Sequence, residues 1–344
     1  MEALRKNEIN WGILGCARIA ERALVPAFRQ ASRAVLHGIA SRDEGRAREW
    51  AARFGFRRSY PSYGALLEDP EVDAVYVPLP NDLHAEWAIR AASAGKHVLC
   101  EKPLALNEAE VRKMLEAARV SGVLLLEAFM YRFHPQFEKT MSLVRDGTVG
   151  EIRSFRSAFT FHLTSGEEDY RWRANAGGGA LYDVGCYAVN AARTVFGEEP
   201  VLVYARSRLH PKFGVDSSTS LLLEFPGARC ALLEGAFDAQ FQSYFEIVGT
   251  EGKISLPRSF SARGTDVSIH VSRRDKTETI SVPAANEYAR MVDHFGDCLR
   301  NGRPLRYSAD DAIGNARVIG AAFESVRIGG PVSLSPGESK IPRP

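Results

Sequence analysis

The sequence predicts an α/β protein: a doubly wound parallel sheet comes first, and an α+β domain with an open, largely antiparallel sheet follows. Short apolar runs alternate with helical stretches from Ile9 to Leu126, which is typical of βαβ units. After Gly150 the pattern changes to strands of alternating polarity. The chain has 344 residues, 45% of them hydrophobic, so it is long enough for about two domains.

The first half contains the alternating strands and helices. Apolar runs predict strands at 9–14, 35–40, 74–77, 97–100 and 123–126. Helical spacing of apolar residues predicts helices at 19–30, 44–54, 83–94 and 108–121. We therefore expect a nucleotide-binding domain over residues 1–127.

The second half is predicted to be mostly sheet, with one helix interrupting it. Strands are expected at 151–161, 218–225, 229–237 and 244–248, and helices at 179–196, 286–300 and 309–327. A domain for substrate binding and oligomerisation then spans 128–330, and whether the helix at 309–327 packs back on the first domain is open. The tail 331–344 is rich in Pro, Ser and Gly, which predicts a loose segment.

Charge and cysteine usage exclude several classes of function. The formal charge is +2 and the cations are spread along the chain, so neither nucleic acid nor a membrane is expected as a partner. The 5 cysteines form no Cys-x-x-Cys pair, which argues against a disulfide framework and against a metal site. No signal-like N-terminus and no apolar run of membrane length is visible, so a cytoplasmic location is expected.

A glycine turn between the first strand and first helix predicts dinucleotide binding. In such a turn the first glycine permits a tight bend, and the phosphates lie on the helix N-terminus. Alanines replace the second and third glycines, so the turn alone is weak support, and a plain strand-turn-helix is the alternative. The expected cofactor-binding residues of the turn are Gly15, Cys16, Ala17, Arg18 and Ile19.

The end of the second strand favours NADP over NAD. An NAD enzyme would present Asp or Glu to the ribose hydroxyl here, whereas this chain has Ser41 and Arg42. A hydroxyl and a guanidinium suit a 2′-phosphate, which a carboxylate would repel. Arg18 offers a second cation, while Asp43 leaves the preference for NADP less than strict.

Two further loops follow strands on the same edge of the predicted sheet. The run from Val77 to His84 contains two prolines that fix an extended turn, which favours a cofactor groove, although a simple connector is the alternative. Glu101-Lys102-Pro103 follows the next strand, where open α/β sheets place their chemistry. From these loops we expect cofactor contacts from Pro78, Leu79, Asn81, His84, Glu101 and Lys102.

Five ordered motifs together resemble the glucose-fructose oxidoreductase and inositol dehydrogenase (Gfo/Idh/MocA) family. They are the turn at 12–20, the Pro-Leu-Pro-Asn-x-x-His run at 78–84, Glu-Lys-Pro at 101–103, Tyr-Arg-Phe-His-Pro at 131–135 and the glycine-rich run at 177–187. The resemblance spans most of the chain. It implies an N-terminal Rossmann domain and a C-terminal domain whose open sheet commonly pairs subunits, here as a homodimer or homotetramer.

The resemblance also implies the catalytic residues. Lys102 inherits the family lysine beside nicotinamide, and its ammonium suits stabilisation of alkoxide charge. Tyr187 stands where many members have histidine, as in the branch of dimeric dihydrodiol dehydrogenase, xylose dehydrogenase and sugar ketoreductases, whose phenol is taken as the acid/base. Asp183 precedes Tyr187 by one helical turn and is expected to position it. Asn190 replaces an acidic family position, which argues against a metal site.

Substrate contacts are expected from the segment before the triple glycine and from the loop after the last Rossmann strand. Arg171, Trp172 and Arg173 offer donors and a flat ring for a sugar or aromatic diol. Arg132 is a further candidate, with a structural ion pair as the alternative role. Tyr187 completes the expected substrate-binding set.

The sequence therefore predicts an NADP-dependent dehydrogenase or reductase. Its implied substrate is a small sugar-like molecule: a sugar, a sugar derivative including a nucleotide-linked ketosugar, or a cyclic diol. A catalytically silent NADP-binding sensor of the same fold is the alternative, and the presence of both Lys102 and Tyr187 favours the enzyme. Ping-pong exchange on a retained cofactor is a third, weaker hypothesis.

Overall fold

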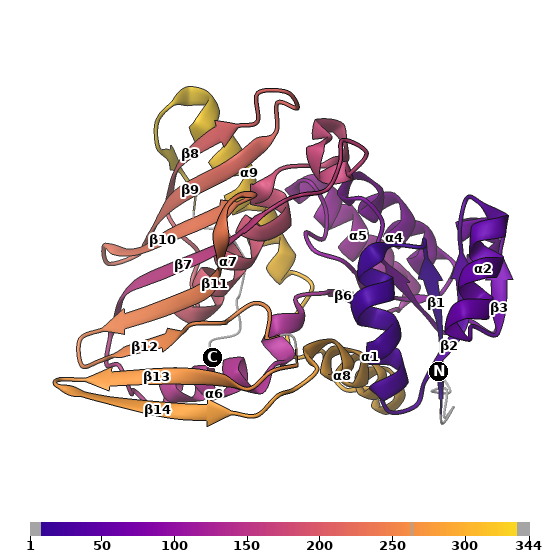
Figure 1. Cartoon of the computed structure of the whole chain (residues 1–344), viewed down its shortest axis with the longest axis horizontal. Helices are drawn as coiled ribbons and strands as arrows, with labels where there is room; N and C mark the ends of the chain where they lie inside the picture. Colours follow the sequence, from indigo (N-terminus) through magenta and orange to yellow (C-terminus); the bar gives the residue numbers. More distant parts are fainter. Residues whose placement is uncertain (1–7, 263, 336–344) are drawn as a thin grey trace. The chain divides into compact units, whose positions relative to one another are not determined.

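A computed structural model describes residues 8–262 and 264–335, and these form two compact units (Figure 1). The first contains residues 8–130 together with 286–312, and the second contains 131–285 together with 313–335. The predicted fold class is confirmed: a parallel sheet in the first unit and a mostly antiparallel one in the second.

The first unit contains a six-stranded sheet in the order β3-β2-β1-β4-β5-β6, with every neighbouring pair parallel. Its strands are β1 (Ile9–Leu14), β2 (Ala34–Ala40), β3 (Arg58–Tyr60), β4 (Ala74–Val77), β5 (His97–Cys100) and β6 (Leu125–Glu127). The helical segments are η1 (Ala20–Leu24), α1 (Val25–Gln30), α2 (Glu44–Phe54), α3 (Tyr63–Glu68), η2 (Asn81–Leu83), α4 (His84–Ser93), α5 (Glu108–Ser121) and α8 (Glu287–Asn301).

Residues of β1 explain how helices cover both faces of this sheet. The Trp11 ring lies 5.1 Å from Phe28 of α1 and 5.4 Å from Phe295 of α8, measured between ring centroids. The neighbouring Gly12 faces the other way, where a Cβ atom would lie 2.6 Å from Leu66 of α3. At this point of the strand a large residue on one face and a glycine on the other let helices pack closely on both sides.

The second unit contains a nine-stranded sheet in the order β14-β13-β12-β11-β7-β10-β9-β8-β15, in which β7 and β10 are the parallel pair. Its strands are β7 (Ile152–His162), β8 (Leu202–Leu209), β9 (Asp216–Phe225), β10 (Arg229–Ala236), β11 (Asp238–Gly249), β12 (Lys253–Leu256), β13 (Val267–Arg273), β14 (Lys276–Val282) and β15 (Val332–Ser333). The helical segments are η3 (Met130–Phe133), α6 (Pro135–Arg145), η4 (Tyr170–Trp172), η5 (Ala174–Ala176), η6 (Leu181–Gly185), α7 (Cys186–Phe196) and α9 (Asp311–Ile328).

Helix α7 is buried along its whole length against this sheet, and a buried arginine fixes its C-terminal end. Arg193 forms two hydrogen bonds of 2.6–2.7 Å with Glu199 and donates at 2.6 Å to Asn315 of α9. A buried guanidinium requires such complete pairing because its desolvation is costly. The contact joins α7 to α9 within the unit.

Two parts of the sequence interpretation differ from the structure. The segment 286–312, assigned above to the second domain, belongs to the first unit, because α8 packs on α1 and Asp293 accepts a 2.5 Å hydrogen bond from the Ser32 amide. Part of the tail predicted to be loose forms β15, which pairs with β8, and residues 336–344 lie outside the described residues. A two-residue strand is too short for the alternation that identifies longer ones.

Candidate active site

The first glycine turn lies at the carboxyl ends of β1 and β2. Gly15 has a φ angle of +105°, and its amide donates to Ala40 O at 2.9 Å. A Cβ atom at Gly15 would lie 3.0 Å from the Leu79 side chain, so only glycine allows the turn to approach the neighbouring loop. The helix that follows begins with the π-helical turn η1, because Pro26 has no N–H to continue the α pattern.

Ser41, Arg42 and Arg46 form a polar corner at the end of β2. Ser41 is buried and its hydroxyl accepts from the Asp43 amide at 3.1 Å, whereas Arg42 is exposed. Arg46, one turn into α2, donates to Cys16 O at 2.9 Å and so lies against the glycine turn. The sequence interpretation missed Arg46; its spacing of four residues from Arg42 on the first turn of a helix was the available signal.

The Asp43 carboxylate is the N-cap of α2. Its Oδ1 accepts from the Arg46 amide at 3.1 Å, which satisfies one of the donors at the start of the helix. This geometry explains how an acidic residue can adjoin a cationic corner, and it fits the 2′-phosphate of NADP better than the ribose hydroxyls of NAD.

Cys16 is half-buried in the glycine turn. Burial raises the pKa of the Cys16 thiol to about 11, although Arg46 and Ser41 act in the opposite direction. The thiol is therefore protonated at neutral pH and contributes volume to the turn without acting as a nucleophile. Ala17 and Ile19 are partly exposed beside it, and Arg18 is exposed.

His84 joins two of the predicted loops. Its Nδ1 lies 2.8 Å from Pro103 O, its Nε2 lies 2.8 Å from Leu79 O, and the side chain is buried. Burial, and more weakly the charge of Lys102, lower the pKa of His84 against the opposing effect of the two carbonyls. The structure thus places His84 between the loop after β4 and the loop after β5, which braces both.

The Glu101-Lys102-Pro103 turn is held from one side by β4. The Tyr76 hydroxyl donates to Glu101 Oε1 at 2.5 Å, and the Lys102 amide donates to Glu101 Oε2 at 3.3 Å. The peptide bond between Lys102 and Pro103 is cis. Lys102 is partly exposed while Glu101 and Pro103 are buried, and the Glu101 carboxylate orders the turn through these two hydrogen bonds. Pro78, Leu79 and Asn81 are buried in the adjoining loop.

In the second unit Asp183 lies within η6 and is paired with Arg171. Arg171 Nε donates to Asp183 Oδ2 at 2.7 Å, and its Nη1 lies 3.4 Å from Asp169 Oδ2. The Asp183 carboxylate raises the pKa of Arg171 further above its ordinary value. Arg171 was predicted to contact substrate. In the structure its guanidinium pairs with Asp183, and 27% of its side chain is exposed.

Tyr187 lies on the first turn of α7 in an aromatic cluster. Its ring centroid is 5.3 Å from Phe159, 5.5 Å from Phe260 and 6.0 Å from Tyr131. The Tyr131 hydroxyl donates to Asn190 Oδ1 at 2.6 Å, so this asparagine serves a buried hydrogen bond within the cluster. The rings fix the direction of the Tyr187 side chain, which is 5% exposed.

Three further candidates, Trp172, Arg173 and Arg132, lie in the second unit. The Trp172 ring packs against two neighbouring rings, with His210 at 4.9 Å and Phe213 stacked at 5.2 Å between centroids, so it offers less free ring surface than the sequence suggested. Arg173 is exposed and donates to Glu168 O. Arg132 is 8% exposed within η3.

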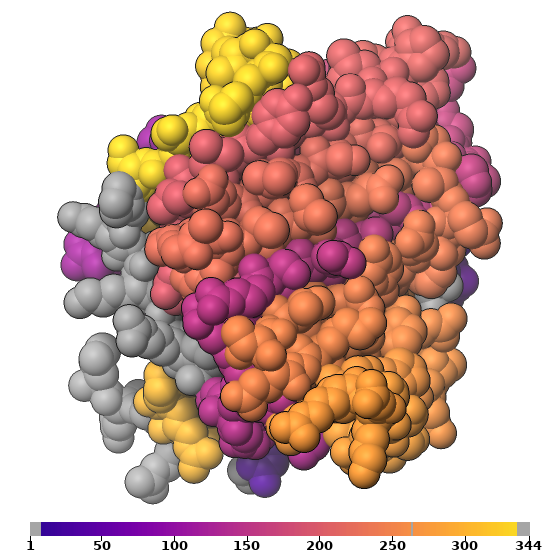
Figure 2. All heavy atoms as spheres, turned by 90° about the vertical axis from the view of Figure 1, so that its left-hand side faces the viewer, coloured from indigo at the N-terminus to yellow at the C-terminus, as the bar shows by residue number. Residues whose placement is uncertain are grey.

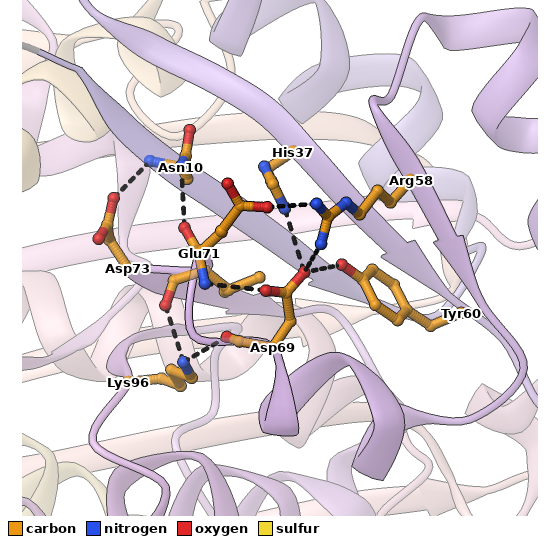
Figure 3. A network of polar contacts seen from close by, with 9 residues as sticks. Asn10, His37, Arg58, Tyr60, Asp69, Glu71, Asp73 and Lys96 are labelled. Carbon is orange, nitrogen blue, oxygen red and sulfur yellow. Dashed lines mark hydrogen bonds and ion pairs between the residues drawn. The ribbon is translucent and has the colours of Figure 1, made fainter.

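The described residues contain one group with metal-ligand types, His37, Asp69 and Glu71, at the amino ends of the strands in the first unit (Figure 3). Arg58 lies 2.9 Å from Asp69 Oδ2 and also pairs with Glu71, so a guanidinium supplies the positive charge there. Burial would raise the pKa of Asp69, but hydrogen bonds from Tyr60, the Glu71 amide and His37 lower it below its usual range.

Comparison with known proteins places the chain in a family. Residues 9–129 match the oxidoreductase family with an NAD-binding Rossmann fold, and residues 137–255 match the GFO/IDH/MocA C-terminal domain. The chain belongs to this oxidoreductase family. It is therefore an oxidoreductase with an NAD(P)-binding Rossmann domain, and the resemblance inferred from the five motifs is confirmed.

Three relatives illustrate the range of the family. D-xylose 1-dehydrogenase (NADP⁺) 2 of Haloferax volcanii is 38% identical, over 94% of this chain and 99% of its own. The crystal structure of a 3-ketoreductase from Actinomadura kijaniata with NADP and TDP-benzene has a TM-score of 0.87 at 35% identity, covering 93% of this chain and 98% of that one. Trans-1,2-dihydrobenzene-1,2-diol dehydrogenase of Xenopus laevis is 32% identical, over 92% of this chain and 98% of its own.

In the described residues no helix has the length and apolar character needed to cross a membrane.

Proposed function

We propose that this protein is an NADP-dependent oxidoreductase acting on a CH–OH or C=O carbon of a sugar, a sugar derivative or a cyclic diol. The observation that carries the choice of cofactor is the corner of Ser41, Arg42 and Arg46 beside the Gly15 turn, with the Asp43 carboxylate turned to its own helix. The relatives supply the substrate class: a sugar dehydrogenase, a nucleotide-linked ketosugar reductase and a dihydrodiol dehydrogenase.

In this proposal the first unit holds the cofactor and the second holds the substrate. The amides at the start of η1 receive the diphosphate, and Ser41, Arg42, Arg46 and Arg18 receive the 2′-phosphate. The loop with Pro78, Leu79 and Asn81 and the turn with Glu101 and Lys102 receive the nicotinamide end. NADP, when bound, supplies or accepts the hydride.

Lys102 and Tyr187 are proposed to divide the remaining chemistry. The Lys102 ammonium stabilises negative charge on the reacting oxygen, and the Tyr187 hydroxyl delivers or removes the proton there. Asp183, held by Arg171, keeps the start of the helix ordered around Tyr187. Structures of the Actinomadura ketoreductase include variants in which a lysine is replaced by alanine or glutamate and a tyrosine by phenylalanine, the same two residue types.

Arg171, Arg173 and Arg132 are proposed to contact the substrate together with the Trp172 ring, and of the three arginines Arg132 is the buried one. The partial exposure of Arg171 supports a double role, since one edge of its guanidinium is occupied by Asp183. The direction of hydride transfer depends on the substrate: a CH–OH carbon gives a hydride to NADP⁺, and a C=O carbon accepts one from NADPH.

The outer face of the nine-stranded sheet is proposed to pair two copies of the chain as a homodimer, or as part of a homotetramer. Figure 2 shows one face of the molecule on which atoms of the second unit, coloured magenta to orange, are exposed in broad bands. Leu222 of β9 and Leu232 of β10 are opposite one another in the register and are 36% and 47% exposed. Because adjacent exposed leucines can form the centre of an apolar contact, this pair is where we propose that the two copies meet. We expect Leu232→Glu to reduce the molar mass measured by light scattering; an unchanged mass would exclude this face.

The cytoplasm is proposed as the location. All 5 cysteines are free thiols, which suits a reducing compartment. Fractionation of cells producing the full chain checks this proposal.

The decisive experiment mixes the purified protein with NADPH and a panel of ketosugars, free and nucleotide-linked, or with NADP⁺ and aldoses or cyclic diols, and follows the absorbance of the reduced cofactor. Turnover by the wild type, and its loss in Lys102→Met and in Tyr187→Phe, is expected. Two groups that act in one step give non-additive losses, so the double variant should be little worse than the poorer single one.

A sensor of the same fold is the second candidate. It would bind NADPH and give no turnover with any member of the panel. The relatives above are enzymes, and the chain retains both Lys102 and Tyr187, so neither finding favours the sensor.

A further inference from the structure

Asp216, which begins β9, is a buried carboxylate aimed at the start of the helix that carries Asp183 and Tyr187. Its Oδ2 accepts from the Leu181 amide at 2.7 Å and from the Thr219 hydroxyl at 2.8 Å, and the residue is 3% exposed. The contact joins residues 35 positions apart in the chain, so it fixes the helix to the sheet and not to its own local turn.

Gly179 leaves the space that this carboxylate fills. A Cβ atom at Gly179 would lie 2.0 Å from Asp216 Oδ1, and the residue has a φ angle of +111°. An atom at 2.0 Å is far inside van der Waals contact, so any side chain at this position must displace the carboxylate or the helix start.

A second close approach holds the same segment on the sheet. At Gly235 of β10 a Cβ atom would lie 2.8 Å from the Gly185 amide nitrogen, so the backbones of β10 and η6 nearly touch. Between these two contacts the chain is π-helical, with the Cys186 amide bonded to Leu181 O. π-turns are strained and occur often at functional sites, which points to a geometry imposed from outside the helix.

We propose that Asp216 is a positioning residue for catalysis: by holding the Leu181 amide it sets the π-turn that orients Asp183 and Tyr187. This inference depends on the function proposed above for those two residues. Asp216 itself touches neither the substrate nor the cofactor in this role.

The electrostatics of Asp216 argue against a role in stability alone. Burial raises the pKa of Asp216 to about 6, against the hydrogen bonds from Leu181 and Thr219 that lower it. A carboxylate that stabilises the fold as a helix cap usually has a lowered pKa, because the helix favours its charged form. The raised pKa of Asp216 means that its charged form is disfavoured in the folded protein. This burial falls on the same carboxylate whose contacts with the Leu181 amide and with the space above Gly179 carry the proposal.

The first test compares two replacements of Asp216. Asp216→Ala removes the acceptor, and we expect kcat to fall about 10-fold to 100-fold, the loss typical of a small misplacement, with the Kd for NADPH unchanged. Asp216→Asn keeps one oxygen for the Leu181 amide but replaces the other acceptor by an NH2 group, although the carboxylate also accepts from the Ala180 amide, so we expect a kcat between those of Asp216→Ala and the wild type. A folded Asp216→Ala with wild-type kcat overturns the proposal, as does an Asp216→Asn no better than Asp216→Ala.

The second test displaces the carboxylate from the opposite side without altering it. Gly179→Ala should lower kcat to a similar extent. Adding Asp216→Ala to Gly179→Ala should cost little more, because both changes break the same contact. Gly214→Ala is a control for a positive φ without a steric conflict: Gly214 has a φ of +69°, a less strained value than that of Gly179, and no atom lies within 4 Å of its added Cβ. Equal losses in Gly179→Ala and Gly214→Ala would assign the effect to backbone strain and overturn the proposal. If Asp216→Ala does not fold, Gly179→Ala against this control decides the question.

Amide hydrogen exchange separates this proposal from the proposed function. The Leu181 amide should be protected in the wild type and lose protection in Asp216→Ala, whatever the substrate. Wild-type protein without turnover on any substrate contradicts the proposed function. Active wild-type protein whose Asp216→Ala variant loses Leu181 protection but keeps its kcat contradicts only the positioning role.

Discussion

The amino and carboxyl ends of the parallel sheet both contain charged and polar side chains, but these side chains make different kinds of contact. At the amino ends, Asp69 accepts hydrogen bonds from Tyr60, Arg58 and His37, and Lys96 donates to Asp69 O at 2.7 Å (Figure 3). At the carboxyl ends, Arg46 donates to Cys16 O and His84 lies between Leu79 O and Pro103 O, which are backbone carbonyls of loops.

The difference is in the direction in which the polar groups point. The Asp69 network closes on itself, with an internal cation for its carboxylates, so it stabilises the edge of the sheet and leaves little for a ligand. At the carboxyl ends the polar contacts shape loops, while Arg42 is exposed and Lys102 partly so. A cluster of charges is therefore a weak sign of a site unless some of its hydrogen-bonding capacity is directed outward.

The largest effect is expected at Lys102. Lys102→Met should lower kcat by about 10²–10³-fold, since a preorganised donor to the reacting oxygen typically contributes about 2.7–4 kcal/mol. The Kd for NADPH, measured by fluorescence titration, should change little. Unchanged turnover would show that Lys102, which follows β5, takes no part in catalysis.

At the opposite end, Asp69→Ala should affect stability and not catalysis. Removing a buried carboxylate with several charged or hydrogen-bonded partners should cost about 3 kcal/mol in the free energy of unfolding. Urea unfolding measures the loss, and kcat of the folded variant is the control. A large fall in kcat with wild-type stability would show that Asp69, at the amino ends of the strands, contributes to catalysis and not to stability.

Arg42→Ala tests the cofactor corner. It should weaken NADPH binding by about 1.5–3 kcal/mol, as expected for a hydrogen bond to a charged group, and leave NADH binding nearly unchanged. Arg48→Ala on the exposed side of α2, where Arg48 pairs with Glu44, is the matched control. Equal losses for both cofactors in Arg42→Ala would contradict the 2′-phosphate role.

The smallest effect is a pH dependence from Asp69. Its pKa is lowered in the folded protein, so its contribution to stability is present above the ordinary aspartate pKa of about 4 and is lost as pH falls below it. Asp69→Asn should therefore show a shallower loss of unfolding free energy between about pH 5 and pH 3 than the wild type. Parallel curves for the two proteins would show that the carboxylate is not specifically stabilised.

Much of the fold was predictable because its elements are long and periodic. The strands at 9–14, 74–77 and 97–100 and the helices at 44–54 and 108–121 have the predicted bounds. The short elements β3 and α3 were missed, since three to six residues carry too little periodicity. Helix α6 was missed as well; it starts at Pro135, directly after the His134 N-cap.

The candidate site was predictable where a motif carries it, as at Gly15 and in the Glu101-Lys102-Pro103 turn. Contacts between distant residues were not predictable, because nothing in the sequence near Asp216 indicates that it meets Leu181. For the same reason Trp172 was read as a free stacking surface, although His210 and Phe213, some 40 residues later, occupy its ring system. The catalytic roles of Lys102 and Tyr187 remain predictions.

The double contact of His84 has a practical consequence for protein engineering. Because one imidazole lies 2.8 Å from both Leu79 O and Pro103 O, the loops after β4 and β5 pack on the same side chain. Grafting either loop alone from a homologue would leave the ring facing a carbonyl in the wrong place. A chimaera that aims at a new substrate should exchange residues 78–84 and 101–103 together, as one cassette.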